Sequence, residues 1–191
     1  MDSVRMGFAM CGSYCTFEKV FAELDLLSRE FDIFPILSEN AAATDSRFGT
    51  AAAHRARLEM LTGRSLIDSI AKAEPIGPRK LLDVLVIAPC TGNTLAKLAH
   101  GITDSAVTMA AKAHLRNGRP VVVAVSTNDG LSGSAANIGA LLARRGYYFV
   151  PFTQDDPERK PASLVADFSR IGDTVRAALE GKQIQPVLLR T

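Results

Sequence analysis

The 191-residue sequence lacks a strong excess of charge of either sign. It contains 22 lysines and arginines against 20 aspartates and glutamates, which gives a formal net charge of +2. Domains that bind nucleic acids usually carry clustered basic residues, and no basic run occurs here. We therefore expect no nucleic-acid partner.

Long hydrophobic runs are also absent. The longest apolar stretches, such as residues 84–89 and 120–125, are far shorter than the roughly 20 residues that a membrane-spanning helix needs. The first residues hold Asp2 and Arg5 before a brief apolar run, without the apolar core and cleavage motif of a secretory signal peptide. We expect a cytoplasmic protein that does not enter a membrane.

Cysteine is scarce, with Cys11, Cys15 and Cys90 alone in the chain. An odd number in a chain of this size does not resemble the disulfide framework of a small secreted domain, and it fits a reducing cytosol. Cys11 and Cys15 have no second pair or histidine cluster that would complete a four-ligand zinc site. We therefore predict no metal site.

The apolar segments alternate between strand-like and helix-like patterns. With 47% hydrophobic and 22% charged residues, the composition is that of a globular protein, and we expect one domain over residues 1–191. Residues 82–88 are almost wholly aliphatic, as in a strand covered by helices on both faces. We predict a three-layer α/β fold, Rossmann-like or flavodoxin-like, with an open parallel sheet and helices on both faces.

The elements that we expect follow from hydrophobic periodicity and from glycine and proline positions. The predicted strands are residues 4–10, 31–37, 82–88, 121–125 and 147–152. The predicted helices are residues 17–27, 51–61, 65–73, 94–100, 105–116, 134–145 and 163–180. Residues 38–50 should form a long connection, and the charged residues 154–161 a solvent-facing turn or a contact with a partner.

Ligands of open α/β sheets bind beyond the carboxyl ends of the strands, where this sequence has polar turns. In the first turn, Gly12 would let the backbone approach a ligand, and the hydroxyls of Ser13 and Thr16 at a helix N-terminus suit a phosphate. The turn has neither the G-x-G-x-x-G arrangement nor a P-loop lysine, which argues against NAD and ATP. An ordinary helix cap would use the same residues, so both interpretations stay open.

The turn after the predicted central strand, residues 88–94, is unusually rich in small hydrogen-bonding residues, with the sequence A-P-C-T-G-N-T. Such side chains can bind the edge of a planar heterocycle without adding charge, which suits the isoalloxazine and ribityl groups of a flavin. Residues 38–40 and 126–130 are also polar strand ends, although ordinary turns have the same composition.

Residues 88–99, with the sequence A-P-C-T-G-N-T-L-A-K-L-A, and residues 101–104, G-I-T-D, resemble two motifs of one known family. The motifs are A-P-x-x-x-N-T-x-A-K-x-A and G-I-A-D, of the homo-oligomeric flavin-containing cysteine decarboxylases. Residues 47–49, 72–78, 126–129 and 154–157 are similar to one branch of this family, the B subunits of a two-subunit oxidoreductase that makes a pyridine dicarboxylate. The resemblance covers nearly the whole chain.

The resemblance implies that the chain binds flavin mononucleotide (FMN) and works in an oxidoreductase complex, although it identifies no catalytic residue. The partner would be the A subunit, which binds NADP, and the B subunit would form a homo-oligomer built from trimers. The substrate would be a dihydro precursor of the dicarboxylate, oxidised in the mother cell of a spore-forming bacterium. The residues implied to bind FMN are Gly12, Ser13, Ser38, Pro89, Thr91, Asn93, Thr94 and Ser126.

Two family motifs are changed in this sequence. The decarboxylases carry a histidine before the central strand, where this chain has Pro75. Their substrate motif P-A-M-N is replaced by V-S-T-N at residues 125–128, which keeps only Asn128. We therefore do not expect decarboxylation of a peptidyl cysteine, and we assign Asn128 to substrate binding.

Arg47, in the long connection, is our candidate for pairing with a substrate carboxylate, because a guanidinium binds carboxylates in a bidentate manner. A solvated loop arginine would look the same in sequence. His54, His100 and His114 fall on predicted helices and are expected to be surface or packing residues, and Cys90 is expected to be a packing residue.

Two further functions fit the same sequence. The chain could be a non-catalytic partner whose flavin site stabilises or regulates the A subunit. Alternatively, it could be an FMN-dependent decarboxylase-like or prenyl-transfer enzyme that acts alone.

Overall fold

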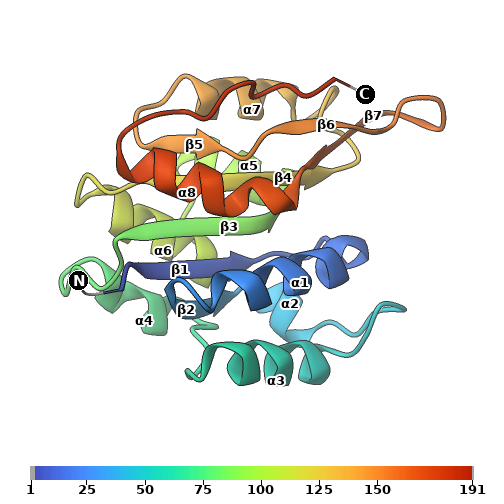
Figure 1. Cartoon of the computed structure of the whole chain (residues 1–191). Helices are drawn as coiled ribbons and strands as arrows, with labels where there is room; N and C mark the ends of the chain where they lie inside the picture. Colours follow the sequence, from blue (N-terminus) through green and yellow to red (C-terminus); the bar gives the residue numbers. More distant parts are fainter. Residues whose placement is uncertain (1–2, 191) are drawn as a thin grey trace.

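The computed structural model describes residues 3–190. Within these residues, seven strands form one sheet in the order β2-β1-β3-β4-β7-β6, and β5 also pairs with β4 (Figure 1). Strands β1 to β5 are parallel where they pair, which confirms an α/β fold with a mostly parallel sheet. The strands are β1 (Arg5–Met10), β2 (Asp32–Leu37), β3 (Val84–Cys90), β4 (Val121–Thr127), β5 (Tyr147–Phe149), β6 (Phe152–Asp156) and β7 (Lys160–Ala166).

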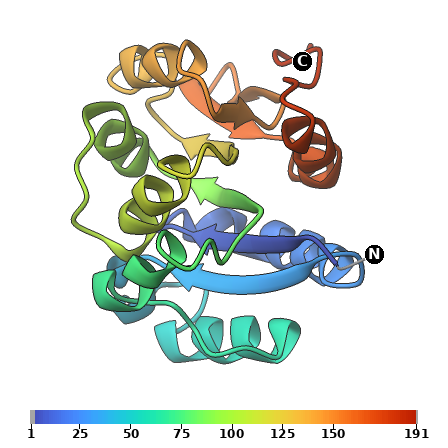
Figure 2. The ribbon, with the colours of Figure 1, turned by 90° about the vertical axis from the view of Figure 1, so that its left-hand side faces the viewer.

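Helices cover both faces of the sheet. Figures 1 and 2 show α1 and α8 on one face and α5 and α6 on the other. The helices are α1 (Phe17–Leu27), α2 (Glu39–Ala43), α3 (Ala51–Thr62), α4 (Ile70–Ala73), α5 (Gly92–His100), α6 (Ala106–Leu115), α7 (Ala135–Leu142) and α8 (Ile171–Leu179). Short 3₁₀ turns lie at Tyr14–Thr16, Glu74–Ile76 and Phe168–Arg170. None of the helices within residues 3–190 is both long and apolar enough to cross a membrane.

The central strands have the composition that a doubly covered sheet requires. Every residue of β3 is buried, and so is every residue of β4 except Thr127. Their valines and isoleucines are stiff side chains that favour extended backbone and fill the space on both faces. Because β1, β3 and β4 are parallel neighbours, their carboxyl ends lie at the same end of the sheet, where the polar turns follow.

The C-terminal third of the chain differs from our sequence-based prediction. The prediction of a single strand over residues 147–152 is wrong. Strand β5, which pairs with β4, ends at Phe149, and a separate strand, β6, begins at Phe152. A helix over residues 163–180 is also wrong, because residues 160–166 form β7, and α8 begins only at Ile171. Strand β7 is antiparallel to both β6 and β4, so the sheet is not entirely parallel.

The physical reason is pairing with a distant segment. Val165 and Leu164 pair with Ser126 and Thr127, the last residues of β4, and Leu164 is buried there. Hydrogen bonds and burial at this position outweigh the weak local helix preference of a short segment. Residues 157–159 form the turn of the resulting hairpin, between Asp156 at the end of β6 and Lys160 at the start of β7.

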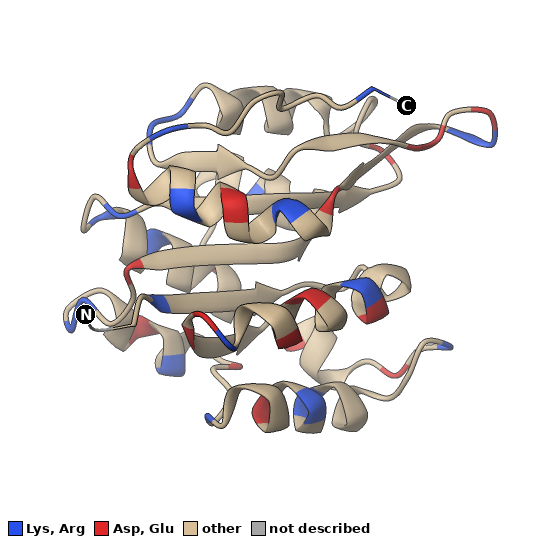
Figure 3. Cartoon of the chain, in the orientation of Figure 1, with Lys and Arg blue, Asp and Glu red and all other residues tan. Residues whose placement is uncertain are grey.

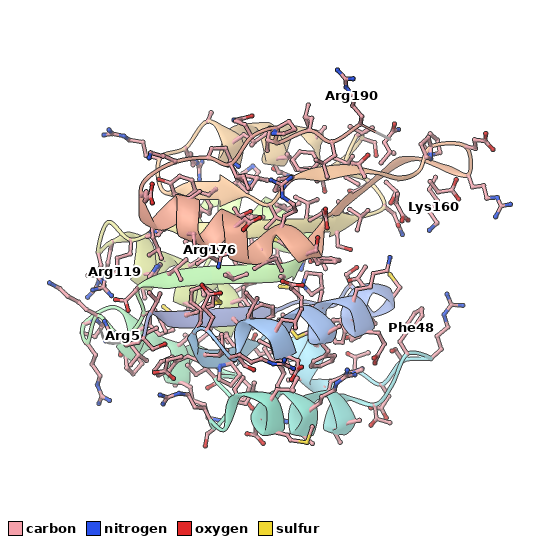
Figure 4. The ribbon with its side chains drawn as sticks, in the orientation of Figure 1. Arg5, Phe48, Arg119, Lys160, Arg176 and Arg190 are labelled. Atoms are coloured by element: carbon pink, nitrogen blue, oxygen red, sulfur yellow. The ribbon has the colours of Figure 1, made fainter. Side chains whose placement is uncertain are left out.

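Two smaller differences concern the segment between β2 and β3. The helix predicted over residues 65–73 is limited to Ile70–Ala73, because Ile67 instead pairs with Ile36 beside β2. The long connection over residues 38–50 contains the short helix α2. Its remaining part, around Phe48, and the β6–β7 hairpin both project beyond the carboxyl end of the sheet (Figures 1 and 4).

Two of the three histidines are buried. His54 packs against Phe17 and Phe21, and its Nε2 has no hydrogen-bond partner within the described residues. His114 is buried on α6, where its Nε2 lies 3.0 Å from the carbonyl oxygen of Pro120. Because a carbonyl oxygen can only accept, Nε2–H donates this hydrogen bond. Burial lowers the pKa of both imidazoles, that of His114 to about 4.

We expect His114→Gln to change how stability depends on pH. Burial holds the pKa of His114 at about 4 in the folded protein, whereas it is about 6.5 in an unfolded chain. As the pH falls from about 7.5 to about 5, only the unfolded chain takes up this proton, which lowers the wild-type free energy of unfolding by about 2 kcal/mol. The variant lacks this contribution. Urea unfolding of both proteins at the two pH values measures the difference, and equal losses would contradict the assignment.

Candidate functional site

Two adjoining cavities open at the carboxyl end of the sheet. The first, of about 420 Å³, is lined by Gly12, Ser38, Thr91, Asn93 and Thr94, among others. The second, of about 400 Å³, is lined by Gly12, Ser13, Thr91, Ser126 and Asn128, among others. Gly12 and Thr91 line both cavities, so the two are neighbours with a common wall. The structure thus brings together seven of the eight residues assigned to FMN, and Asn128 with them.

The remaining two predicted residues lie outside both cavities. Pro89 contributes through its backbone. Its carbonyl oxygen accepts a hydrogen bond from the Cys11 N–H at 3.3 Å, and this bond joins the ends of β1 and β3 next to the turns. Arg47 lies on an exposed turn closed by hydrogen bonds between Ser46 and Gly49. Its guanidinium lies 4.8 Å from the ring centre of Phe48, at the end of the projecting loop in Figure 4.

The first and last turns of the site are joined directly. The hydroxyl oxygens of Ser13 and Ser126 lie 2.8 Å apart, at hydrogen-bond distance. Ser13 follows β1 and Ser126 is near the end of β4, so this contact crosses the end of β3. It holds together residues that are far apart in the sequence.

The middle turn is organised by the start of α5. Thr91 caps this helix, because its hydroxyl accepts the N–H of Thr94 at 3.3 Å. The Thr94 hydroxyl donates to the sulfur of Cys11 at 3.3 Å. Burial raises the pKa of the Cys11 thiol to about 11 and raises that of Cys90 as well. Both thiols therefore stay protonated near neutral pH and serve as packing groups rather than nucleophiles.

Asp129 holds together the segment between β4 and α7, which lies close to the start of α5. Its Oδ1 accepts hydrogen bonds from the hydroxyls of Thr127 at 2.5 Å and Ser134 at 2.9 Å. These hydrogen bonds lower the pKa of Asp129, with Thr127 making the largest contribution. A Cβ atom on Gly92 would lie 2.6 Å from Ser134 Oγ and 2.8 Å from both Asp129 Oδ1 and Thr127 Oγ1. Only glycine allows this close approach, which neither motif nor composition had indicated.

The charges of the first cavity are mostly paired. Lys97 Nζ lies 2.9 Å from Asp104 Oδ1. The Glu39 carboxylate accepts the backbone N–H of Ala106 at the start of α6, at 2.9 and 3.1 Å. The cavity therefore presents one lysine and several neutral hydroxyl and amide groups, without an unpaired carboxylate from Glu39 or Asp104.

The second cavity contains charged residues that the sequence analysis had not assigned to the site. Lys19 comes from α1, and Asp155 and Lys160 come from the β6–β7 hairpin. Figure 3 shows charges of both signs on this projecting hairpin. The charged run at residues 154–161 was the only sequence signal for these contacts. Across residues 3–190, no three His, Cys, Asp or Glu side chains gather closely enough to hold a metal ion.

Comparison with known proteins agrees with the geometry and with the family resemblance. The model of the family described as Flavoprotein matches residues 1–161. The B subunit of dipicolinate synthase from Bacillus subtilis (strain 168) is 46% identical over 186 residues, which cover 97% of this chain and 93% of that protein.

Solved structures show the same relationship. The crystal structure of the dipicolinate synthase B subunit from Bacillus halodurans superposes with a TM-score of 0.90 and 42% identity, with full coverage of both chains. The FMN-dependent cysteine decarboxylase SpaF has a TM-score of 0.67 and 25% identity, with 92% of this chain and 97% of that chain covered. The chain therefore belongs to the flavoprotein family and, within it, to the B subunits of dipicolinate synthase.

Proposed function

We propose that this chain is an FMN-binding protein that acts with the A subunit of dipicolinate synthase to oxidise a dihydrodipicolinate-type precursor to dipicolinate during sporulation. The reaction would take place in the cytoplasm of the mother cell, with NADP bound to the A subunit, while the B subunits would be assembled from trimers. One observation carries the proposal, namely that the turns after four strands, β1 to β4, meet around two cavities lined largely by neutral hydroxyl and amide groups.

The groups that line the first cavity suit FMN. Ser38, Thr91 and Asn93 can donate hydrogen bonds to ribityl and phosphate oxygens, and Lys97, which is paired with Asp104, lies among them. Helix α5 is nine residues long, and its first turn faces the cavity, so its free backbone N–H groups favour an anion. The carboxylates of Glu39 and Asp104 are already engaged, which limits repulsion of a phosphate.

The role of the protein would be to bind and orient. Bound FMN supplies a group that can accept a hydride. Neither cavity, as lined by the described residues, contains a histidine, and the Cys11 thiol is held protonated. Ser13 and Ser126, joined at 2.8 Å, lie in the second cavity beside the common wall and would fix the relative position of cofactor and substrate. SpaF is named as FMN-dependent, which supports the choice of cofactor.

The first test is the visible absorption spectrum of the purified protein, followed by identification of any chromophore released on denaturation. We expect bound FMN, or uptake of added FMN, and rapid flavin reduction by NADPH only when the A subunit is present. Full synthase activity in a flavin-free variant would instead indicate a structural or regulatory partner. Turnover without the A subunit would indicate an enzyme that acts alone.

We expect Gly92→Ala to weaken FMN binding about tenfold, which corresponds to about 1.4 kcal/mol. The added methyl group would come within 2.6–2.8 Å of the side-chain oxygens of Thr127, Asp129 and Ser134. The start of α5, next to Thr91, would therefore have to move away from these residues. The overpacking should also cost about 1–3 kcal/mol of stability. Titration with FMN and thermal unfolding measure the two effects.

Gly139→Ala is the matched control. Gly139 lies on an exposed part of α7, and a Cβ atom there would meet no atom within 4 Å. Alanine should stabilise this helix slightly and leave FMN binding unchanged. Equal FMN affinity in Gly92→Ala and Gly139→Ala would refute the role of the Gly92 contact.

A further inference from the structure

The second cavity has three walls from distant parts of the chain. Lys19 lies on α1, Ser126 and Asn128 lie at the end of β4, and Lys160 begins β7 on the hairpin. The cavity shares Gly12 and Thr91 with the first cavity, so a molecule bound in it would lie beside one bound in the first. Its volume of about 400 Å³ falls within the usual range of small-molecule sites, roughly 300–1,000 Å³.

We propose that this cavity binds a small planar dicarboxylate, with Lys19 and Lys160 each pairing with one of its carboxylates. The proposal rests on the proposed function, because it assigns the substrate site of the same reaction. It adds the residues that recognise the substrate and the reason why two carboxylates are required.

The charges of the cavity favour an anionic ligand. Two lysines line it, against one carboxylate, Asp155. Asp155 Oδ2 lies 3.0 Å from Lys160 Nζ, and both side chains are about half exposed. Lys19 is exposed, and no carboxylate within residues 3–190 lies within ion-pair distance of it. The cavity therefore has one lysine without a counter-charge and one whose partner a ligand could replace.

The neutral groups of the cavity also point toward an acceptor-rich ligand. Ser163 Oγ lies 3.4 Å from the Thr127 carbonyl oxygen and 3.5 Å from Asn128 Oδ1, so its one hydroxyl hydrogen faces two acceptors, of which the Asn128 amide oxygen is one. The amide NH₂ group of Asn128 is then available to donate to a ligand. The hydroxyls of Ser13 and Ser126 lie in the same cavity.

The positions of the lysines explain a preference for two carboxylates. Lys19 and Lys160 belong to a helix and a hairpin that form different walls of the cavity, and Figure 4 shows Lys160 on the side of the hairpin that faces α1. A single carboxylate could pair with both only if the two ammonium groups lay close together, whereas two carboxylates can pair with lysines on separate walls. The geometry favours this pair over Arg47, which lines neither cavity and contacts Phe48 instead.

The test is calorimetric titration of the full-length protein, with and without saturating FMN, using pyridine-2,6-dicarboxylate and pyridine-2-carboxylate as probes. We expect the wild-type protein to bind the dicarboxylate at least tenfold more tightly than the monocarboxylate. Lys19→Met and Lys160→Met should each reduce dicarboxylate affinity about tenfold and remove most of the preference. The combined loss from removing one lysine and one carboxylate should be smaller than the sum of the separate losses, because the two groups interact.

Three further variants test whether the effect is specific to Lys19 and Lys160. Lys182→Met removes a lysine that pairs with Glu180 outside the cavity, and Arg47→Met tests the residue chosen from sequence. Both should bind the dicarboxylate as the wild-type protein does. Asp155→Asn should strengthen binding severalfold by freeing Lys160, and it should have no such effect in the Lys160→Met background.

The inference is overturned if the wild-type protein does not bind the dicarboxylate, if it binds both probes equally, or if Lys19→Met and Lys160→Met bind as the wild type does. Circular dichroism and FMN titration of each variant separate loss of the carboxylate contact from loss of the fold. If the protein binds the dicarboxylate through the lysines but never binds FMN, the proposed cofactor role fails and this inference stands.

Discussion

Burial of β1, β3 and β4 between two helix layers is the constraint on which the rest of the molecule depends. Strands covered on both faces must be aliphatic, so their polar residues are confined to the turns that follow. The parallel register brings these turns to one end of the sheet, with Ala9 opposite Ile87 and Cys90 opposite Val125. The hydrogen bonds between Cys11 and Pro89 and between Ser13 and Ser126 follow from that alignment.

Much of this could be predicted from the sequence, because the central strands and their turns are encoded locally. The aliphatic runs predicted β3 and β4, and the small polar residues after them predicted the lining of the site. Strand β7 could not be predicted in this way, because residues 160–166 become a strand only by pairing with β4 and β6. Lys160 and Asp155 of the second cavity were missed for the same reason, since their positions depend on that hairpin.

Several thiols and carboxylates near the site are buried or engaged within the chain. Burial keeps the thiols of Cys11 and Cys90 protonated. The carboxylates of Glu39, Asp104 and Asp129 are all engaged by donors within the chain. Among the charged groups of the second cavity, Lys19 is the one that has no counter-charge within the described residues.

The wall shared by the two cavities has a consequence for how a ligand in one would affect a ligand in the other. Thr91 is held by the first turn of α5 and by the contact of Gly92 with the β4–α7 loop, so both cavities depend on the position of one short backbone segment. A ligand that shifts this segment from one side would change the free energy of binding on the other. Thermodynamic linkage would make any such coupling equal in both directions, whichever ligand binds first.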